Sequence, residues 1–341
     1  MESNENRITM IELKVYKLHF TTPLHISNNR SDYAISYQTI ASDTMYAALT
    51  SCLSKLGESI PKDGDLGFSI SSLFPFYQKA KGEKTSYFFP KPLLAKLPTL
   101  DIENNKKIKK IAWVDSSYFS QILFGKDLQE ANGKDKLIND IQGKYLCGSR
   151  LENKDFVRSC GIQRVSIEDR SMHSEAKPYF VDRIKFEDYA GLFFIYQGNE
   201  SVLDKALSLL SVEGIGTDRN IGNGFFEFEK DTISLDIPST ADNFVNLSIL
   251  FPENEEQTRS FMDSENIAYE LQRRGGWITS YPFQTLRKNY IYGFKEGSVL
   301  KKQTSTLETI GTIVDLRPKY NDSNLHSIWR SGRSLILPIN I

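Results

Sequence analysis

Apolar and polar positions near the start of the chain predict one long strand followed by one helix. From Met10 to Phe20 the apolar residues alternate, and they change from one phase of alternation to the other halfway along. This change of phase is typical of a strand that is either bulged or buried on both faces. After Ser42-Asp43, which reads as a helix start, apolar residues from Met45 to Leu56 recur at helical spacing. Gly57 then predicts the end of the helix.

Three later segments continue the pattern in the order strand, helix, strand. Residues 191–196 are a short apolar run, residues 201–212 have the spacing of an amphipathic helix, and the segment from Phe225 alternates as far as Ile237. Together with the first strand and helix they give a β-α and β-α-β order. This order predicts a ferredoxin-like sheet with its helices on one face.

A long, loop-rich insertion, about residues 58–185, separates the two halves of this unit. A structureless stretch of that length is unusual in a folded domain, so we expect the insertion to contain elements of its own. Residues 158–170 alternate like a strand, and residues 178–183 read as a returning strand. They predict a protruding β-hairpin, or thumb, near residues 158–183. The basic cluster at residues 106–110 favours a solvated loop.

The length of 341 residues predicts two domains. We expect a disordered tail at residues 1–9, an N-terminal ferredoxin-like domain with the insertion at residues 10–237, and a C-terminal ferredoxin-like domain at residues 238–341. The predicted fold class is α+β. In the second domain we expect one helix and three strands, which are residues 267–273 and residues 245–251, 290–294 and 312–316.

Composition restricts the kinds of partner that the chain can have. The formal net charge is −1, which argues against a free-standing nucleic-acid binder held by bulk charge. However, residues 273–341 contain eleven Lys and Arg against four Asp and Glu, so RNA contact would be local. No apolar run is long enough to cross a membrane, and the polar first residues do not resemble a signal peptide. Three scattered cysteines indicate reduced thiols and a cytoplasmic protein.

A glycine-rich loop between the predicted helix at 201–212 and the strand after it is the main candidate binding element. Gly214 can serve as the residue after the helix, but this leaves three further glycines without a capping role. Exposed amides in such a loop can bind an anion, and Arg219 adds a guanidinium suited to phosphate. A set of tight turns is the alternative interpretation. The candidate residues of the loop are Gly216, Thr217, Asp218, Arg219, Asn220, Gly222, Asn223 and Gly224.

Catalytic and metal chemistry have weaker support in the sequence. His25, in the loop after the first strand, is the one good candidate for a general acid or base in RNA cleavage. A loop histidine more often forms a hydrogen bond or stacks on a ring. Four scattered histidines and three scattered cysteines have no metal-ligand spacing, so we expect no metal and no cofactor.

Several of these segments together resemble the RAMP (repeat-associated mysterious protein) superfamily of CRISPR–Cas systems. The glycine loop is similar to the superfamily's Gly-rich loop, although the family usually has a further glycine where Thr217 stands. More closely, the chain resembles the family of fourth subunits of the type III-A (Csm) interference complex. The segments that carry this resemblance are residues 24–27 with 32–33, 42–44, 165–170, 272–277, 296–298, 311–316, and His326 with 329–332. It spans nearly the whole chain and is weakest at residues 58–145.

The resemblance implies a non-catalytic, crRNA-binding role in antiviral defence. Such a subunit binds the 5′ handle of the CRISPR RNA, contacts the large Cas10-type subunit and abuts the adjacent backbone RAMP subunit. Its hairpin lies where the handle meets the guide, near the target RNA. Besides the loop residues, the residues expected at the RNA are His25, Arg158, Arg164, Arg170, Arg274, Gly275 and Arg330. Two alternatives remain: a metal-independent CRISPR RNA endonuclease that uses His25, and a scaffold without RNA contact.

Overall fold

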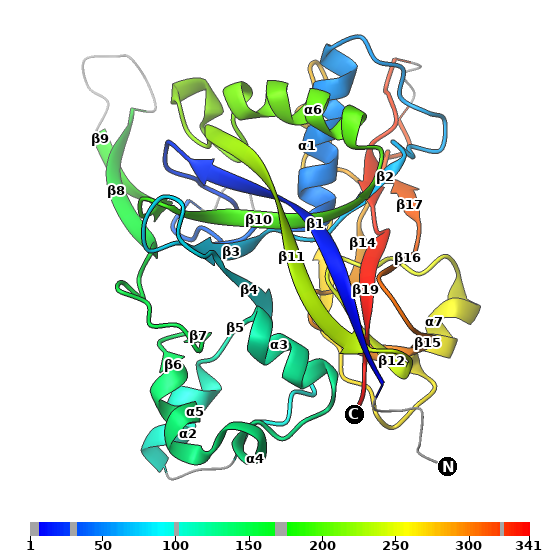
Figure 1. Ribbon diagram of the computed structural model, residues 1–341. Helices are drawn as coiled ribbons and strands as arrows, with labels where there is room; N and C mark the ends of the chain where they lie inside the picture. Colours follow the sequence, from blue (N-terminus) through cyan, green and yellow to red (C-terminus); the bar gives the residue numbers. More distant parts are fainter. Residues whose placement is uncertain (1–6, 28–32, 99–101, 168–175, 321–323) are drawn as a thin grey trace.

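The computed structural model describes residues 7–27, 33–98, 102–167, 176–320 and 324–341, and it has a mixed α+β architecture (Figure 1). A large sheet runs through the centre of the molecule, two helices cover its upper face in Figure 1, and a smaller sheet packs below it. The strand pattern of the sequence therefore predicts the fold class at the level of α+β.

Most strands belong to the first two-thirds of the chain. The large sheet has the order β11-β1-β10-β3-β4-β5-β7-β6, and β2 also pairs with β10. The bounds are β1 (Ile8–Phe20), β2 (Phe68–Ile70), β3 (Phe74–Tyr77), β4 (Ser86–Pro90), β5 (Trp113–Asp115), β6 (Ile141–Gln142), β7 (Tyr145–Leu146), β10 (Ala190–Gly198) and β11 (Phe226–Pro238).

Strand β1 is buried on both faces, which decides between the two interpretations of its sequence. Its pairing with β11 runs without a shift from Ile8 opposite Pro238 to Phe20 opposite Phe226, so it contains no bulge against that strand. Leu13 and Val15 pack in the core below the sheet, whereas Tyr16 and Leu18 pack in the core above it. The alternation therefore changes phase because the first of these residues are buried below the sheet and the later ones are buried above it.

Two helices cover the upper face of the large sheet. They are α1 (Ser42–Lys55) and α6 (Glu200–Glu213), which contact each other and bury Met45, Leu49, Leu203 and Leu207. Both helices follow the predicted segments closely. Helix α1 connects β1 to β2 and β3, and α6 connects β10 to β11. Each crossover therefore passes over one strand of the sheet, β10 for α1 and β1 for α6.

The insertion folds into elements of its own, as its length predicts. Its helices are α2 (Ile102–Lys109), α3 (Ser116–Leu123), α4 (Leu128–Asn132) and α5 (Lys134–Asp140). Helix α3 begins at Asp115, whose carboxylate accepts from the amide of Tyr118, and it packs Phe119 flat on Phe89 of β4. Most of the basic cluster at 106–110 lies on α2, so the prediction of a loop there is wrong.

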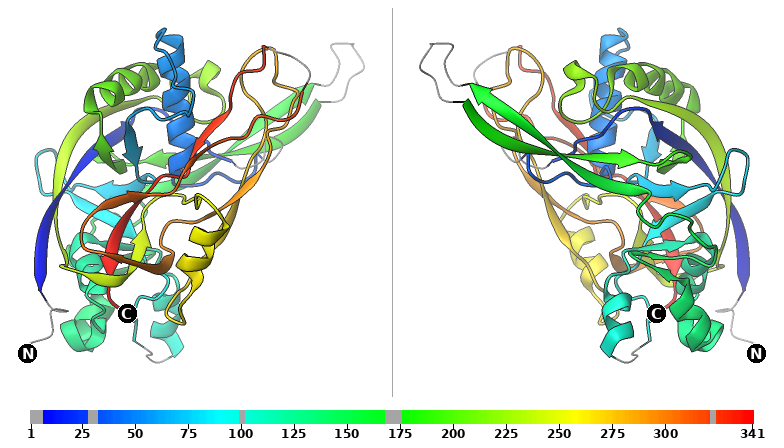
Figure 2. Two further views of the ribbon diagram at one scale, coloured as in Figure 1. Left: turned by 90° about the vertical axis from the view of Figure 1, so that its right-hand side faces the viewer. Right: turned by 90° about the vertical axis from the view of Figure 1, so that its left-hand side faces the viewer.

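Strands β8 (Val157–Ile167) and β9 (Ala176–Phe186) form an antiparallel hairpin with an unbroken register. Figure 2 shows the hairpin extending away from the large sheet. Its base is tied to the body by mutual backbone hydrogen bonds between Leu24 and Ile184. Most of the predicted residues 158–183 thus lie in two paired strands, whereas 168–175 are outside the described residues.

The last hundred residues form a smaller sheet with the order β15-β12-β19-β16, together with helix α7 (Glu255–Met262) and two two-stranded pairs. The strands are β12 (Ala241–Asn246), β13 (Leu271–Arg274), β14 (Ile291–Phe294), β15 (Val299–Thr304), β16 (Glu308–Ile310), β17 (Ile313–Asp315), β18 (Trp329–Ser331) and β19 (Ser334–Ile339). The expected strands near 290–294 and 312–316 are present as β14 and β17. The predicted strand at 245–251 is largely wrong, because β12 spans Ala241–Asn246 and residues 247–251 follow it outside any strand.

The predicted helix at residues 267–273 is wrong. In its place, Ala268 forms a bridge to Val299, and Leu271–Arg274 pairs with β14 as strand β13. The apolar positions Ile267 and Leu271 have helical spacing, but Leu271 is 56% exposed and covers no core. Pairing with distant strands outweighs the local pattern here.

The two sheets share one apolar core. Leu13, Phe193 and Leu235 of the large sheet lie in the same buried cluster as Val245 and Leu337 of the smaller sheet. Ser248 reinforces this contact, because its hydroxyl donates to the carbonyl of Ile70. The packing therefore fixes residues 270–295 and 330 beside the N-terminal end of α1, where the candidate site lies.

Candidate nucleic-acid interface

The glycine loop leaves α6 at Gly214 and returns into β11 through two tight turns. All four glycines have positive φ: +77° at Gly214, +93° at Gly216, +88° at Gly222 and +73° at Gly224. A Cβ at Gly224 would lie 1.9 Å from the carbonyl oxygen of Ile215, and a Cβ at Gly214 would lie 2.5 Å from that of Asn223. These two glycines therefore close the neck of the loop by letting its two arms touch.

The third close approach joins the loop to the segment after β1. A Cβ at Gly216 would lie 2.4 Å from the carbonyl oxygen of His25, and the amide of Thr217 donates to that same oxygen at 3.0 Å. A Cβ at Gly222 would meet nothing within 4 Å. Backbone packing thus explains three of the loop's four glycines, and Gly222 is the one of the four at which a Cβ would meet open space.

Several backbone amides of the loop already donate hydrogen bonds to carbonyl groups of the protein. The amides of Ile221, Gly222 and Asn223 donate to carbonyls of the same loop, and the amide of Gly224 donates to that of Pro23. These amides are unavailable as ligands for an anion while the loop keeps this conformation. Arg219 is different, because its side chain is 44% exposed and its nearest carboxylate, that of Glu213, is 3.9 Å away.

His25 is buried beneath the loop, with 1% of its surface exposed. Its Nδ1 lies 2.6 Å from the carbonyl oxygen of Asp182 in β9, and its ring lies beside Tyr33. Its own carbonyl holds the amide of Thr217. His25 therefore connects three chain segments, which is the hydrogen-bonding role that the sequence favoured over a catalytic one.

The arginines of the hairpin are in different surroundings. Arg164 lies 2.9 Å from the carboxylate of Asp218, and Arg183 lies 3.5 Å from the same carboxylate. Asp218 has φ +65°, so the carboxylate that ties the hairpin to the glycine loop sits on a left-handed turn. Arg158 is 59% exposed and lies 3.6 Å from Glu187. The predicted contact residue Arg170 lies outside the described residues.

Two adjoining cavities, of about 910 and about 1040 Å³, lie between the glycine loop, the start of α1 and the two-stranded pairs β13–β14 and β17–β18. We call them together the cleft. Both cavities are lined by side chains from distant parts of the chain, namely His25, Ser27, Thr44, Gly216, Thr217, Arg274, Thr279, Lys288 and Arg330. Arg219 lines the first cavity and Gly275 the second. Asn220, Gly222, Asn223 and Gly224 belong to the loop but do not line the cleft.

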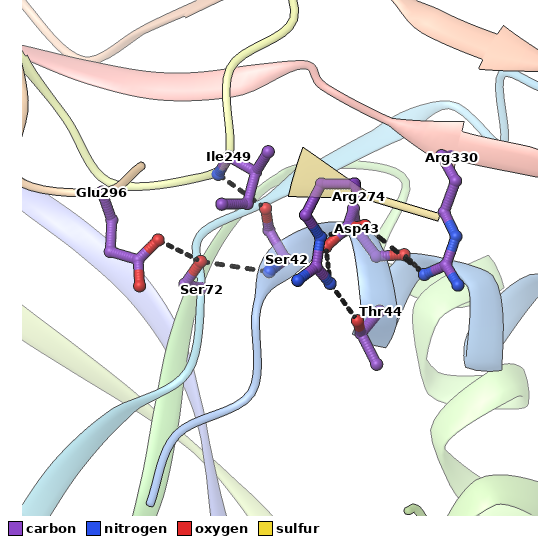
Figure 3. A network of polar contacts seen from close by, with 8 residues as sticks. All are labelled: Ser42, Asp43, Thr44, Ser72, Ile249, Arg274, Glu296 and Arg330. Atoms are coloured by element: carbon purple, nitrogen blue, oxygen red, sulfur yellow. Dashed lines mark hydrogen bonds and ion pairs between the residues drawn. The ribbon is translucent and has the colours of Figure 1, made fainter. Parts of the chain in front are cut away.

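The floor of the cleft is a buried ionic network at the start of α1 (Figure 3). Arg274 of β13 donates from Nε and Nη2 to the two carboxylate oxygens of Asp43, at 2.9 and 2.7 Å, and from Nη2 to the hydroxyl of Thr44 at 2.7 Å. Arg330 of β18 donates from Nη1 to the backbone carbonyl of Asp43 at 3.0 Å. Asp43 is completely buried, so its charge requires these partners.

Ser42 links the same helix end to the second sheet. Its hydroxyl accepts from the amide of Ile249, and its own amide donates to the hydroxyl of Ser72 (Figure 3). The side chain of Ser42 does not cap α1, whose N-cap residue is Ala41. The Ser-Asp pair was correctly predicted as a helix start, but it joins the two sheets and does not cap the helix.

Electrostatics of the network follow from burial and charge. Burial alone would raise the pKa of Asp43, but the charges of Arg274 and Arg330 outweigh burial and lower it. Burial, followed by the charge of Arg330, lowers the pKa of Lys288 to about 7. Burial also raises the pKa of Glu296, which lines the first cavity. Asp43 is thus the firmly ionised acid in a cleft that contains three cations around it.

Aromatic side chains form another wall of the second cavity. The guanidinium of Arg273 lies 4.2 Å from the ring centroid of Tyr290, and that of Arg287 lies 4.7 Å from the ring centroid of Trp277. Tyr290 is 60% exposed. Exposed rings and guanidinium planes are surfaces on which bases of single-stranded RNA can stack.

Sequence reasoning missed Lys288, Arg287 and Tyr290 as lining residues. The signal that could have found the two basic residues is the excess of Lys and Arg over Asp and Glu after residue 273, which does not by itself indicate single positions. In the described residues, no three His, Cys, Asp or Glu side chains gather as a metal site. None of the helices that the structure describes is long and apolar enough to cross a membrane.

Comparisons with known proteins agree with the resemblance seen in the sequence. Residues 239–339 match the family model of the CRISPR Csm4 C-terminal domain. A curated Csm4 protein of Mycobacterium tuberculosis is 25% identical over 90% of this chain and 93% of its own length. Csm4 of Streptococcus thermophilus is 24% identical over 89% and 93%, and Csm4 of Methanocaldococcus jannaschii is 24% identical over 77% and 73%.

Solved structures share the fold. A Csm3–Csm4 subcomplex of a type III-A interference complex contains a chain with a TM-score of 0.58 at 18% identity, covering 97% of this chain and 100% of that one. A chain in a Csm1–Csm4 cassette bound to pppApA has a TM-score of 0.55 at 18% identity, with 97% and 99% covered. These structures show that the chain shares the fold of the matched chains. In sequence it is similar to Csm4 proteins, since the matched C-terminal domain and the curated relatives all carry that name.

Proposed function

We propose that this chain is a subunit of a type III-A CRISPR interference complex and that its cleft holds the repeat-derived 5′ handle of the CRISPR RNA. The observation that carries the proposal is the cleft itself, which the glycine loop helps to line. There β13, β18 and the segment between β13 and β14 place Arg274, Arg330 and Lys288 around the carboxylate of Asp43. A surplus of buried positive charge beside stacking rings suits a single-stranded RNA backbone.

The partners follow from the relatives. The similar solved chains occur with Csm1 and with Csm3, so this chain is expected to bind a large Cas10-type subunit and an adjacent backbone RAMP subunit. The β8–β9 hairpin extends from the body beside the glycine loop, which supports a position where handle, guide and target RNA meet. Such a complex would act in the cytoplasm.

The N-terminal unit has the features of a ferredoxin-like domain. Its four central strands follow the order β11-β1-β10-β3 with α1 and α6 as the crossovers, which is the order of a β-α-β-β-α-β motif. In this arrangement the glycine loop connects the second helix to the last strand. We extend the interpretation to the second sheet, where α7 is the one helix within the described part of residues 238–341.

The subunit is expected to be non-catalytic. His25 is buried and its Nδ1 is held by a backbone carbonyl, a poor arrangement for proton transfer to a 2′-hydroxyl. Labelled repeat RNA incubated with the purified chain, with and without EDTA, should remain intact. Site-specific cleavage that disappears in His25→Ala would instead support the endonuclease alternative.

The proposal is tested by purifying the chain from cells that carry the CRISPR array and sequencing the bound RNA. Handle-containing RNA should be enriched, and Arg219→Ala should reduce its retention while leaving the melting temperature nearly unchanged. The matched control is Arg259→Ala on α7, a residue whose side chain is 82% exposed and is not among those that line the cleft. Equal RNA retention by the wild type, Arg219→Ala and Arg259→Ala would mean that the glycine loop does not contact the RNA. If the wild type itself does not enrich handle-containing RNA, the proposal of handle binding is refuted.

A further inference from the structure

The three cations around Asp43, which are Arg274, Lys288 and Arg330, are not equivalent. Arg274 is fully engaged, because its guanidinium spans both oxygens of Asp43 and the hydroxyl of Thr44, and only 8% of its side chain is exposed. Contact with RNA would require Arg274 to abandon a buried carboxylate. Arg274 is therefore a structural residue, in contrast to the role that the sequence assigned to it.

Arg330 and Lys288 still have donors to offer. Arg330 gives Nη1 to the backbone of Asp43, but its Nε is buried without a hydrogen-bond partner among the described residues. In the part of the chain that the structure describes, no carboxylate lies within ion-pair distance of the Lys288 ammonium. Both side chains line both cavities. Unpaired donors in a half-buried cleft need a ligand or water to offset their lost hydration.

We infer that Lys288 and Arg330 bind one phosphate group of the RNA, and that Asp43 and Arg274 position these two residues without touching the ligand. The inference rests on the proposed function and assigns its contacts. A phosphate accepts from a guanidinium and an ammonium together, and it neutralises charge that Asp43 alone leaves uncompensated. A neutral base edge would satisfy the donors but would leave the excess charge buried.

Other charged groups near Lys288 do not compete for this role. Lys295 is paired with Glu270, and Arg273 and Arg287 stack on aromatic rings. Glu296 faces Ser72 at 3.5 Å, and burial raises its pKa, so it supplies less negative charge than an ordinary glutamate. Two histidines also border this region, His25 in the cleft and His326 in the neighbouring cavity beside Lys288.

A phosphate ligand has a consequence for pH. Lys288 has a pKa of about 7 without ligand, and a bound phosphate favours its charged form. Binding above that pH therefore takes up a proton, and affinity falls as the pH rises. One proton per binding event gives a loss of up to about tenfold between about pH 6 and about pH 8.

The experiment measures binding of a fluorescent single-stranded RNA with the sequence of the repeat-derived handle to the full chain, at several salt concentrations and at both pH values. Lys288→Met should weaken binding at low pH and reduce the slope of log K against log salt by about 0.7, the value for one phosphate contact. Lys288→Arg keeps the charge, so it should keep the salt slope and lose the pH dependence. Lys301→Met, on β15 outside the cleft, is the control.

The arginine variant changes only residue 288, so a pH dependence that survives in it would come from another group and would overturn the role of Lys288. An unchanged salt slope in Lys288→Met would do the same. RNA with a 5′-phosphate, compared with RNA with a 5′-hydroxyl, distinguishes a terminal phosphate from a phosphate within the chain.

A second measurement separates this inference from handle binding. Inorganic phosphate, compared with chloride at equal ionic strength, should raise the melting temperature of the wild-type chain but not that of Lys288→Met. A higher melting temperature in phosphate, without RNA binding, would support the phosphate site and refute the proposed function. RNA binding by the wild type that Lys288→Met leaves intact, with no phosphate shift, would refute the site and keep the function.

Discussion

At the scale of single residues, Asp43 has the largest expected effect on stability. It is completely buried and holds Arg274 by two hydrogen bonds and Arg330 by its backbone carbonyl. Asp43→Asn keeps the shape but removes the charge, so two guanidinium groups lose their counter-ion. We expect the free energy of unfolding to fall by about 3–5 kcal/mol, the usual loss when one member of a buried ion pair is removed.

Urea unfolding of Asp43→Asn beside Asp263→Asn measures this loss. Asp263 lies 3.6 Å from Lys301, and its side chain is 85% exposed, so its replacement should change stability by less than about 0.5 kcal/mol. Equal, small changes in both variants would mean that the Asp43 network is not maintained in solution.

Lys288 should make stability depend on pH in the opposite direction to RNA affinity. Its pKa of about 7 in the folded chain lies below the unfolded value of about 10.4, so the unfolded state binds more protons between these values. The contribution of Lys288 to stability therefore increases as pH rises through this range and is lowest below pH 7. Compared with wild type, Lys288→Met should gain stability at about pH 6, and this advantage should be clearly smaller at about pH 9 and vanish only above about pH 10.4.

Urea titrations of both proteins at the two pH values provide this difference, in which the other titrating groups cancel. A stability difference between the two proteins that stays constant with pH would mean that Lys288 has an ordinary pKa. No sequence pattern marked this residue, because its burial arises from packing of β18 and the start of α1 around it.

At the scale of structural elements, the glycines of the loop differ in their surroundings: three lie against other backbone atoms, and Gly222 does not. Gly224→Ala places a Cβ 1.9 Å from the carbonyl oxygen of Ile215, whereas Gly222→Ala meets nothing within 4 Å. Both substitutions strain a positive φ, by about 1–2 kcal/mol. We expect Gly224→Ala to lose a further 1–3 kcal/mol or so from the overlap, because the two arms of the loop must separate.

Thermal melting of the two alanine variants tests this ranking. If they melt at the same temperature, the neck of the loop is looser than the structure shows. Because Gly222→Ala adds no clash, it is also the better glycine variant for testing RNA binding. A valine at Gly224 would lower stability as well, so an effect on RNA binding could not be separated from it.

The sequence predicts elements well where the local pattern and the packing agree. Strand β1 and helices α1 and α6 show this, since their apolar residues are the ones that become buried. The predicted helix at 267–273 fails because Ala268 and Leu271 pair with distant strands, which no local pattern records. Helix α7 was missed although Asn254 and two glutamates after it form an ordinary helix start.

The candidate site shows the same limit. The glycine loop and His25 were found by residue type and they do lie together, yet the buried role of His25 depends on the distant Asp182. Arg274 and Arg330 were selected for their charge, but their partner Asp43 lies more than two hundred residues earlier in the chain. Which cation is satisfied and which is not depends on this long-range pairing.

At the scale of the whole molecule, the shared core argues against two independent domains. Val245 and Leu337 of the smaller sheet are buried in one cluster with Leu13 and Phe193 of the large sheet. Polar contacts cross the same boundary, since the hydroxyl of Ser42 accepts from the amide of Ile249 and the carboxylate of Asp43 binds Arg274. Separating the halves would expose this apolar surface and leave buried polar groups unpaired.

We therefore expect the full chain to unfold in urea as one cooperative unit, although chains of this length often unfold in steps. Three signals should give the same midpoint. They are far-ultraviolet circular dichroism, the fluorescence of Trp113 in β5 of the insertion, and the fluorescence of Trp329 in β18. Single-tryptophan variants would report each half separately. Two distinct midpoints would show that the boundary near residue 238 divides the chain into units that fold independently, and that the cleft between them can open without global unfolding.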